Sequence, residues 1–414
     1  MGLGRWLQSS DSSVCTSGRS RIAEIWNAGQ RSAVQKSLLG SGKAYAAETL
    51  TRVEAELDRY ASGWAAMHGE ACIAHRRGEQ SAELLDLRMA CLERQRGALR
   101  ATVQVLEEGA PVEHAFDVAS GLPSLASCAD AVGLRRAVKP PSDPVTAKQV
   151  VELRERIVKA EAEERAGRYE RGLSEAAQVE KAAEATQYAP VIAEALFVRA
   201  SLESRLGRYL EAASTLEATY VRALASRQDE LAGQATNLLL YVVGYRQARF
   251  EAVRPWEYAA EALVLRLPEA GRLAVDFYGN RGLIRIQQGL LPQASADTQR
   301  ALVLAEQVFG AHHLKFARVL NNASQIELSR RDYAATLRYQ QQALAIREEI
   351  LGPEHPVVGA SLSSVGSTLK SLGRFSEAAS ALQRALSISE RAAGAEHPDT
   401  AVIRRHTAEV LIRQ

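Results

Sequence analysis

A short turn motif recurs six times in the second half of the chain, at intervals of 40 to 42 residues. It reads AGRYE, LGRYL, ARFEA, GLLPQ, RRDYA and LGRFS in chain order. The residues at the tightest point of the six turns are Gly167, Gly207, Ala248, Gly289, Arg331 and Gly373. Glycine there tolerates positive φ and can close a tight turn between two helices. A repeat of this length predicts stacked pairs of amphipathic helices.

Small residues keep the same register on the predicted helices. The set is Gly282, Ser324 and Gly366 on the first helices of three pairs, and Ala301, Ala343 and Ala385 on the second. Small side chains let two helices cross at short distance. The pattern predicts about six helix pairs, followed by a terminal helix from about residue 399 to 412.

The first half of the chain is also predicted to be helical. Residues 1–20 are rich in Ser and Gly and are predicted to be disordered. Residues 21–138 carry apolar side chains at helical spacing and form the predicted N-terminal helical domain. The sequence KPPSDP then marks a proline-rich linker at 139–146. The repeats occupy 147–414, so the chain is expected to be all-α: a helical domain followed by a right-handed α-solenoid.

Composition limits the partners. The net charge is only +2, which gives no reason to expect nucleic acid or an anionic membrane as a partner. No apolar run is long enough for a signal peptide or a membrane span. The four cysteines are sparse and form no CxxC pair; they are Cys15, Cys72, Cys91 and Cys128. These observations predict a cytoplasmic location and reduced thiols that pack as small apolar groups.

Kinase chemistry is not expected. Phosphoryl transfer by a protein kinase needs a Gly-rich loop with a strand lysine, an H-R-D-x-x-x-x-N loop and a D-F-G motif, and the chain has none of them. The stretch LLGSGKAY resembles half of a phosphate-binding loop. It lacks the first glycine of the motif, since Ser37 stands there, and Ala44 replaces the residue that would hold magnesium. A short turn between helices is expected instead.

Cys72 and His75 are the remaining candidates for chemistry. Three residues apart on one helix face, they could form half of a metal site, or Arg76 and Arg77 could activate a nucleophilic thiol. Because each cysteine lies in an apolar pattern, buried thiols are favoured. No catalytic residue, metal or cofactor is therefore predicted, and an enzyme that uses Cys72 and His75 is the alternative.

Four histidines lie where one repeat passes into the next. They are His312, His313, His355 and His397. They are spread along the array, so they are expected to cap helices or to pack between repeats. Pro356 and Pro398 follow two of them and should start the next helix, where proline is tolerated.

The repeats resemble the tetratricopeptide repeat, in the longer form of about 42 residues found in kinesin light chains. The resemblance is carried by LNNASQIELSRRDYAATLRYQQQALAIREEILGPEHP and by SLGRFSEAASALQRALSISERAAGAEHPDTA. It is close over residues 270–412 and looser over 147–269, where VGYRQARFEAVRPWEYA departs from the pattern. The family's usual Tyr in the first helix is replaced by Arg285 and Glu327.

This resemblance implies a concave groove lined by the first helix of each pair. By repeat position, the residues expected to face it are Asp276, Gln287, Arg318, Asn321, Gln325, Ser363, Ser367 and Lys370. Amides such as Asn321 and Gln325 donate and accept hydrogen bonds, so they could hold the backbone of an extended peptide. The alternative is that these are simply solvated polar positions.

A second resemblance covers about Ile25 to Leu134. WAAMHGEACIAHRRGEQSAELLDLRMACLERQRGALR, followed by LPSLASCAD, is similar to the segment between the catalytic domain and the C-terminal repeats of large bacterial serine/threonine protein kinases. The kinase domain itself is absent. The resemblance implies a non-catalytic sensory or docking module that binds a protein or an extended peptide in signalling, with a kinase as a possible partner. The alternative is a piece of such a kinase that acts with a separately encoded kinase domain.

One charged group in this segment has no partner within its own helix. Arg88 has no carboxylate one turn before or after it. A buried network of Arg88, Glu79 and Asp130 that fixes the helical domain to the first repeats is one hypothesis, and a solvated charged face is the other.

Overall fold

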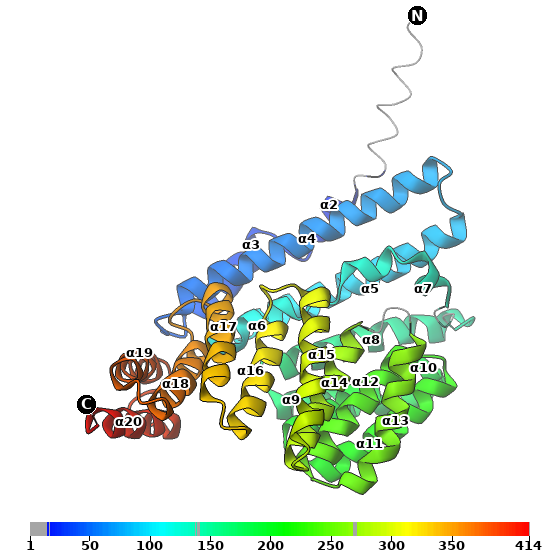
Figure 1. Cartoon of the computed structure of the whole chain (residues 1–414). Coiled ribbons are helices and arrows are strands. Elements are labelled where there is room, and N and C mark those ends of the chain that lie inside the picture. Colours follow the sequence, from blue (N-terminus) through cyan, green and yellow to red (C-terminus); the bar gives the residue numbers. More distant parts are fainter. Residues whose placement is uncertain (1–14, 16, 137, 139–140, 268–270, 414) are drawn as a thin grey trace, which may run out of the picture. The chain divides into compact units, whose positions relative to one another are not determined.

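The computed structural model describes residues 15, 17–136, 138, 141–267 and 271–413 (Figure 1). Every regular element in this part of the chain is a helix, and successive helix pairs pack side by side as in an α-solenoid, so the predicted all-α class is confirmed. Among the described helices, none has the length and apolar character needed to cross a lipid bilayer.

The described residues fall into two compact units. Unit 1 consists of the described residues up to Ser41, together with Leu50–Leu206 and Arg222–Gln228. Unit 2 consists of Gly42–Thr49, Gly207–Val221 and the described residues from Asp229 onward. Helices α4 and α11 have residues in both units.

The N-terminal helices and the first repeat helices supply unit 1. They are α2 (Ser17–Ala23), α3 (Ala28–Leu39), α4 (Ala46–Arg76), α5 (Ala82–Glu107), α6 (Val112–Ser120), the 3₁₀ turn η1 (Leu125–Cys128), α7 (Ala131–Arg136), α8 (Pro144–Arg165), α9 (Tyr169–Thr186) and α10 (Ala189–Arg205). Helices α8 to α10 share one core, to which Ile157, Val179 and Leu202 belong. Hydrogen bonds from Arg100 and Arg168 reach across the predicted linker, to Glu155 and to backbone carbonyls of α5 and its C-cap.

Two parts of the predicted boundaries can be compared with helix positions. Residues 1–14 and 16, predicted to be disordered, lie outside the described residues, but α2 begins at Ser17, inside that range. Residues 139 and 140 of the predicted linker also lie outside them. Helix α8 begins at Pro144, where Asp143 caps it by accepting a hydrogen bond from the Thr146 amide at 2.7 Å.

The prediction of reduced cysteines is wrong, because all four are paired in disulfides. Cys15 is bonded to Cys72 and Cys91 to Cys128, with Cα–Cα distances of 5.6 and 5.4 Å. Each pair joins residues far apart in sequence, at separations of 57 and 37, so no local spacing pattern reveals it.

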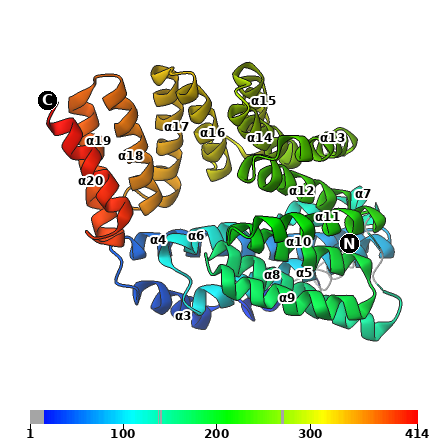
Figure 2. The same cartoon turned by 90° about the horizontal axis from the view of Figure 1, so that it is seen from below.

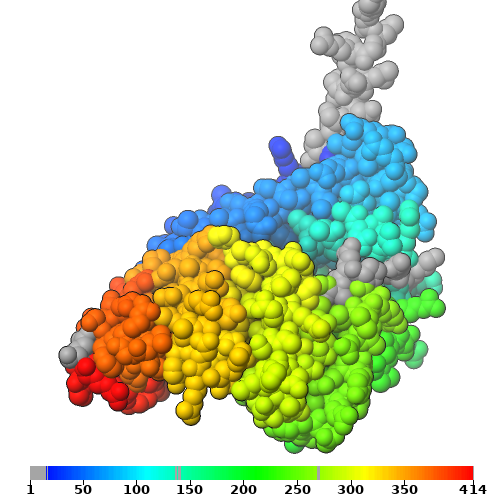
Figure 3. Space-filling model, in the orientation of Figure 1, coloured from blue at the N-terminus to red at the C-terminus, as the bar shows by residue number. Residues whose placement is uncertain are grey.

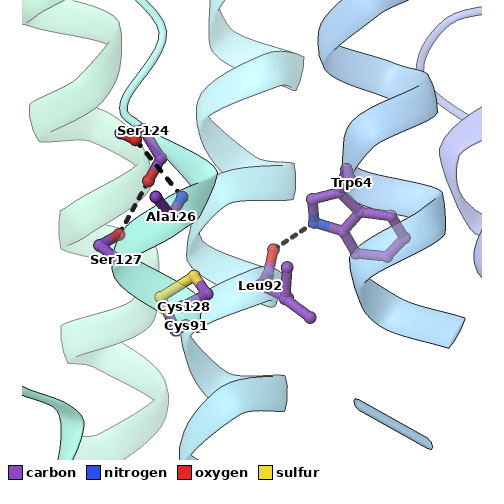
Figure 4. The surroundings of a disulfide bond; sticks show 7 residues. All are labelled: Trp64, Cys91, Leu92, Ser124, Ala126, Ser127 and Cys128. Carbon is purple, nitrogen blue, oxygen red and sulfur yellow. Dashed lines mark hydrogen bonds between the residues drawn. A yellow bond between two sulfur atoms is a disulfide. The ribbon is translucent and has the colours of Figure 1, made fainter. Parts of the chain in front are cut away.

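Trp64 marks the helix contact beside the second disulfide (Figure 4). Its side chain is fully buried, and its indole N–H donates to the Leu92 carbonyl at 2.6 Å, next to Cys91. On the other side of α5, Ser124 caps η1, the turn that ends at Cys128, by accepting a hydrogen bond from the Ala126 amide. The packing of α4, α5 and η1 therefore places Cys91 and Cys128 together.

The repeat helices supply most of unit 2. They are α11 (Tyr209–Ala225), α12 (Asp229–Leu239), the π-helix η2 (Leu240–Arg246), α13 (Phe250–Arg266), α14 (Gly271–Gln287), α15 (Leu291–Phe309), α16 (Leu314–Ser329), α17 (Tyr333–Leu351), α18 (Pro356–Ser371), α19 (Phe375–Ala393) and α20 (Pro398–Leu411). Helices α14 to α20 follow one another as neighbouring hairpins (Figure 2). In the space-filling view the surface passes in chain order from yellow α15 to red α20 (Figure 3).

All six predicted turn positions adopt the left-handed conformation. Their φ angles are 72° at Gly167, 75° at Gly207, 52° at Ala248, 74° at Gly289, 60° at Arg331 and 74° at Gly373. Two of the turns therefore keep this geometry without glycine, which an L-residue adopts at an energetic cost. The repeat register sets the turn even where the preferred residue is missing.

The predicted small positions are confirmed as sites of close helix crossing. Ala301, Ala343 and Ala385 are at most 1% exposed. A Cβ atom added to Gly366 would lie 2.6 Å from Leu382 Cγ, inside the van der Waals distance. The second helix of the pair thus approaches the first at a point that only a very small side chain can occupy.

The stretch that departs from the repeat pattern contains the π-helix. Residues Leu240–Arg246 widen by one residue per turn, and Gln247 N donates to Val242 O, five residues back. Helix α13 then contains Pro255. The looser sequence match of this repeat has a structural cause: an extra residue is taken up before its turn.

A buried ion pair holds the following repeat together. Arg281 on α14 makes two hydrogen bonds to the Asp297 carboxylate on α15, at 2.8 and 2.9 Å, and the Asp297 side chain is only 1% exposed. The Arg281 guanidinium also lies over the Phe277 ring, 4.4 Å from its centroid. Arg285, which replaces the family's usual Tyr, donates to the same carboxylate.

Candidate functional site

The eight residues predicted to line a groove lie on three first helices of unit 2. Asp276 and Gln287 are on α14, Arg318, Asn321 and Gln325 on α16, and Ser363, Ser367 and Lys370 on α18. We call these eight residues, with His406 and Glu409 on α20, the first-helix set. Within each helix the members are three or four residues apart or a multiple of that spacing, so each helix presents them along one stripe.

Polar contacts join members of the set on neighbouring first helices. Arg318 on α16 donates to Asp276 on α14 at 2.7 Å. Lys370 on α18 donates to Glu409 on α20 at 2.7 Å. Each pair spans from one repeat to the next, so these side chains share one surface in each half of the array.

A third contact accompanies the second pair. Ser367 Oγ lies 3.3 Å from His406 Nδ1, again between α18 and α20. Within the described residues, no hydrogen bond or ion pair joins the α16 members of the set to the α18 members. The structure therefore brings together the α14–α16 members and the α18–α20 members.

The amides between these pairs are available to a ligand. The side chains of Asn321, half-buried, and Gln325, exposed, make no hydrogen bond to other described residues; only their backbone carbonyls accept, from Ser324 and Ser329. Each free amide offers two donors and one acceptor oxygen, the pattern that a peptide backbone group needs. Gln287 is exposed at the last residue of α14, and Ser363 is half-buried.

Two members of the set, His406 and Glu409, are not among the predicted residues. The repeat register could have found them, because they stand 42 residues after Ser364 and Ser367. They were missed because α20 is the terminal helix and has no partner helix from which its own repeat position is evident.

Electrostatics around α20 fix the charge state of this end of the surface. The hydrogen bond from Lys370 lowers the pKa of the Glu409 carboxyl, despite some opposing desolvation, so the carboxylate is the stable form. Burial first, and then the nearby Arg405 and Lys370, lower the pKa of His406. The positive charges of the set therefore come from Arg318 and Lys370 rather than from His406.

The junction histidines cap helices, as predicted for this group. His313, His355 and His397 each accept a hydrogen bond at Nδ1 from the backbone amide two residues later, at 3.0, 3.3 and 3.2 Å. The helices that follow His355 and His397 begin at Pro356 and Pro398. His312 is different: it is exposed and lies 2.8 Å from Glu349.

The other sequence candidates for chemistry are occupied by structural contacts. Cys72 has no free thiol, and His75 Nδ1 lies 3.2 Å from the Gln80 carbonyl. The stretch LLGSGKAY forms the connection between α3 and α4, as predicted, and within unit 2 Lys43 donates to the Ala392 carbonyl.

The hypothesised network around Arg88 does not form. Arg88 donates to Gln80 at 2.9 Å, and Asp130 instead accepts from the Val132 amide at 3.0 Å. Glu79 is 4.0 Å from Arg77. Arg88 finds an amide oxygen rather than a carboxylate, which the spacing of charges could not show.

Comparisons with known proteins identify the repeats. A family model described as "Tetratricopeptide repeat" matches residues 316–391, which span α17, most of α16 and α19, and all of α18. Among solved structures, the chain is similar to BtubC (BKLC) from P. vanneervenii, with 19% sequence identity and a TM-score of 0.45 over 62% of this chain and 95% of that one. No curated protein matches the chain.

The class of the C-terminal region follows from the helix pairs and the family match. It is a tetratricopeptide-repeat region, and such repeats are typical of protein-binding scaffolds. The first-helix set can hydrogen-bond and carry charge toward a peptide.

Proposed function

We propose that this chain is a non-catalytic scaffold that binds an extended peptide along the first-helix set. The observation that carries the proposal is the pair of unpartnered amides at Asn321 and Gln325, on the helix that the family match covers best. The cross-repeat pairs Asp276–Arg318 and Lys370–Glu409 hold charged side chains on either side of them. An extended peptide offers one backbone donor and one acceptor per residue, which amides of this kind satisfy.

The signalling context rests on the second resemblance. Similarity of about Ile25 to Leu134 to a segment of bacterial serine/threonine kinases supports a sensory or docking role, with a kinase as partner, or a separately encoded kinase domain acting with this chain. The low net charge supports a protein partner over nucleic acid or an anionic membrane.

The disulfides bear on where the chain works. The cytoplasmic location was inferred from sparse cysteines expected to be reduced, whereas both pairs are bonded. Disulfides of this kind persist in oxidising compartments. We therefore propose that the mature chain acts outside a reducing cytoplasm.

Selection from a random peptide library tests the binding proposal. Peptides retained by the unmodified protein should be lost or bound at least about tenfold more weakly by the double variant Asn321→Ala with Gln325→Ala. The matched control is Gln341→Ala with Gln342→Ala, which removes two exposed amides from the second helix α17. Equal binding by both double variants would contradict the proposal.

A phosphotransfer assay tests the non-catalytic part. Purified protein incubated with labelled ATP and a general kinase substrate should transfer no phosphate. Transfer above that of a heat-unfolded sample would overturn it.

A further inference from the structure

A depression of about 500 Å³ lies in unit 2 at the two turns that precede α11 and α13. Its lining includes Arg208, Tyr209, Leu210, Gln247 and Arg249. No member of the first-helix set lines it, so it is a separate feature of the repeats.

Positive charge predominates around this depression. Arg208 and Arg249 are exposed and line it, against one acidic lining residue, Glu211. A third cation, Arg246, lies over the Tyr209 ring, 4.9 Å from its centroid. The nearby Glu251 is 3.3 Å from Arg254, which takes up its charge. Guanidinium groups in such a cluster favour carboxylates, because the planar fork of donors matches two carboxylate oxygens.

Gln247 supplies an independent sign of a missing acceptor. Its Nε2 group is buried and has no hydrogen-bond partner, while its Oε1 lies 3.4 Å from Arg249 Nη1. A buried N–H without an acceptor is costly, and a ligand oxygen entering the depression would satisfy it.

The π-helix explains why Gln247 occupies this place. Gln247 N donates to Val242 O and Arg249 N donates to Val243 O, five and six residues back. Ala248 between them has a φ of 52°, without the glycine that four of the other five turns have. Single π-helical turns and strained residues cluster at functional sites, because the structure must otherwise compensate for their cost.

An apolar side chain completes the depression. Leu210 is 72% exposed beside the half-buried Tyr209 ring. A small inorganic anion would leave this apolar surface and most of the volume unused.

We infer that this depression binds an acidic segment of a partner protein, with a carboxylate at Arg249 and Gln247 and an adjacent apolar side chain on Leu210. The site does not depend on the peptide surface of the first-helix set, and it gives the scaffold a second point of attachment on the same unit.

Fluorescence anisotropy with a defined probe tests the inference. The probe is a short fluorescein-labelled peptide in which glutamates flank a leucine, and the comparison probe carries glutamines instead. The glutamate probe should bind, and Arg249→Glu and Arg208→Glu should each weaken it by about tenfold or more. Gln247→Leu, which keeps the charge, should weaken it severalfold.

The matched control is Arg374→Glu. Arg374 follows Gly373 as Arg208 follows Gly207, it is exposed, and it makes the same change of charge at another turn. Arg374→Glu and the Asn321→Ala, Gln325→Ala double variant should leave the probe's affinity unchanged. Equal binding of the glutamine probe, competition by inorganic phosphate as effective as by unlabelled peptide, or an equal loss in Arg374→Glu would overturn the inference.

Discussion

Unit 1 and unit 2 are both helical, but different interactions hold them together. Unit 1 contains α5, of 26 residues, and most of α4, of 31 residues, and its two disulfides join positions 57 and 37 residues apart. In unit 2, helices α13 to α19 have 16 to 19 residues each, and their apolar cores join neighbouring pairs. Unit 1 depends on contacts between remote parts of the sequence, and unit 2 on contacts between neighbours.

This difference decides what a sequence can reveal. In a repeat array each unit contacts chiefly the next one, so periodic positions identify both the turns and the crossing points. In unit 1 the partners of Cys15 and Cys91 are set only once several helices have packed.

The largest expected effect tests whether apolar packing alone holds unit 2. Asp297→Ala leaves the buried Arg281 without its carboxylate, and breaking a buried pair in this way costs about 3–5 kcal/mol. Urea unfolding measures it. Asp276→Ala, which breaks the more exposed pair with Arg318, should cost at most about 1 kcal/mol. Similar losses in the two variants would show that burial of the first pair contributes nothing.

The next effect tests the covalent part of the comparison. Cys91→Ser with Cys128→Ser removes a link that closes 37 residues, and we expect unit 1 to lose about 2–4 kcal/mol. Calorimetry should show the transition of unit 1 moving to lower temperature while that of unit 2 stays in place.

Reducing agent supplies the control for this prediction. It should lower the unit 1 transition of the unmodified protein and have a smaller effect on the double variant, which keeps only the Cys15–Cys72 bond. Four thiols reacting in denaturant without reductant would contradict both disulfides.

A smaller effect tests the close crossing of a helix pair in unit 2. Gly366→Ala places a Cβ atom 2.6 Å from Leu382 Cγ, and overpacking of this kind costs about 1–3 kcal/mol. Gly279→Ala is the matched control, because the Cβ atom would meet only Asn322 Nδ2, at 3.9 Å. Since alanine favours helix, Gly279→Ala should be neutral or stabilising. Equal losses at the two positions would argue against the crossing point.

The smallest effect tests the left-handed turns. Ala248→Gly relieves a φ of 52° and should stabilise unit 2 by about 0.5–1 kcal/mol. Gly373→Ala makes the reverse change where no atom lies within 4 Å of the new Cβ, so it isolates the backbone cost, about 1 kcal/mol. Chemical denaturation should give shifts of opposite sign, and shifts of the same sign would contradict the shared turn geometry.

Much of unit 2 could be predicted because its features repeat. The six turns, the buried alanines and the capping histidines all follow from register, and so do the helices that carry the first-helix set. The contacts between helices do not follow in the same way. Nothing in the spacing shows that Arg318 reaches Asp276 or that Lys370 reaches Glu409, because long side chains can adopt several directions.

The π-helix and the disulfides lay beyond sequence reasoning for different reasons. The π-helix appears in the sequence only as a departure from the repeat, which shows that something changes but not what. The cysteines of unit 1 lie in apolar helical patterns that are equally typical of buried thiols.

Hydrogen–deuterium exchange with a library-selected peptide tests the central claim most directly. The account predicts slower amide exchange on peptide binding in α14, α16, α18 and α20, strongest around Asn321 and Gln325, and no such change in the Asn321→Ala, Gln325→Ala double variant. Protection confined to the second helices α15, α17 and α19 would contradict the assignment of peptide binding to the first-helix set.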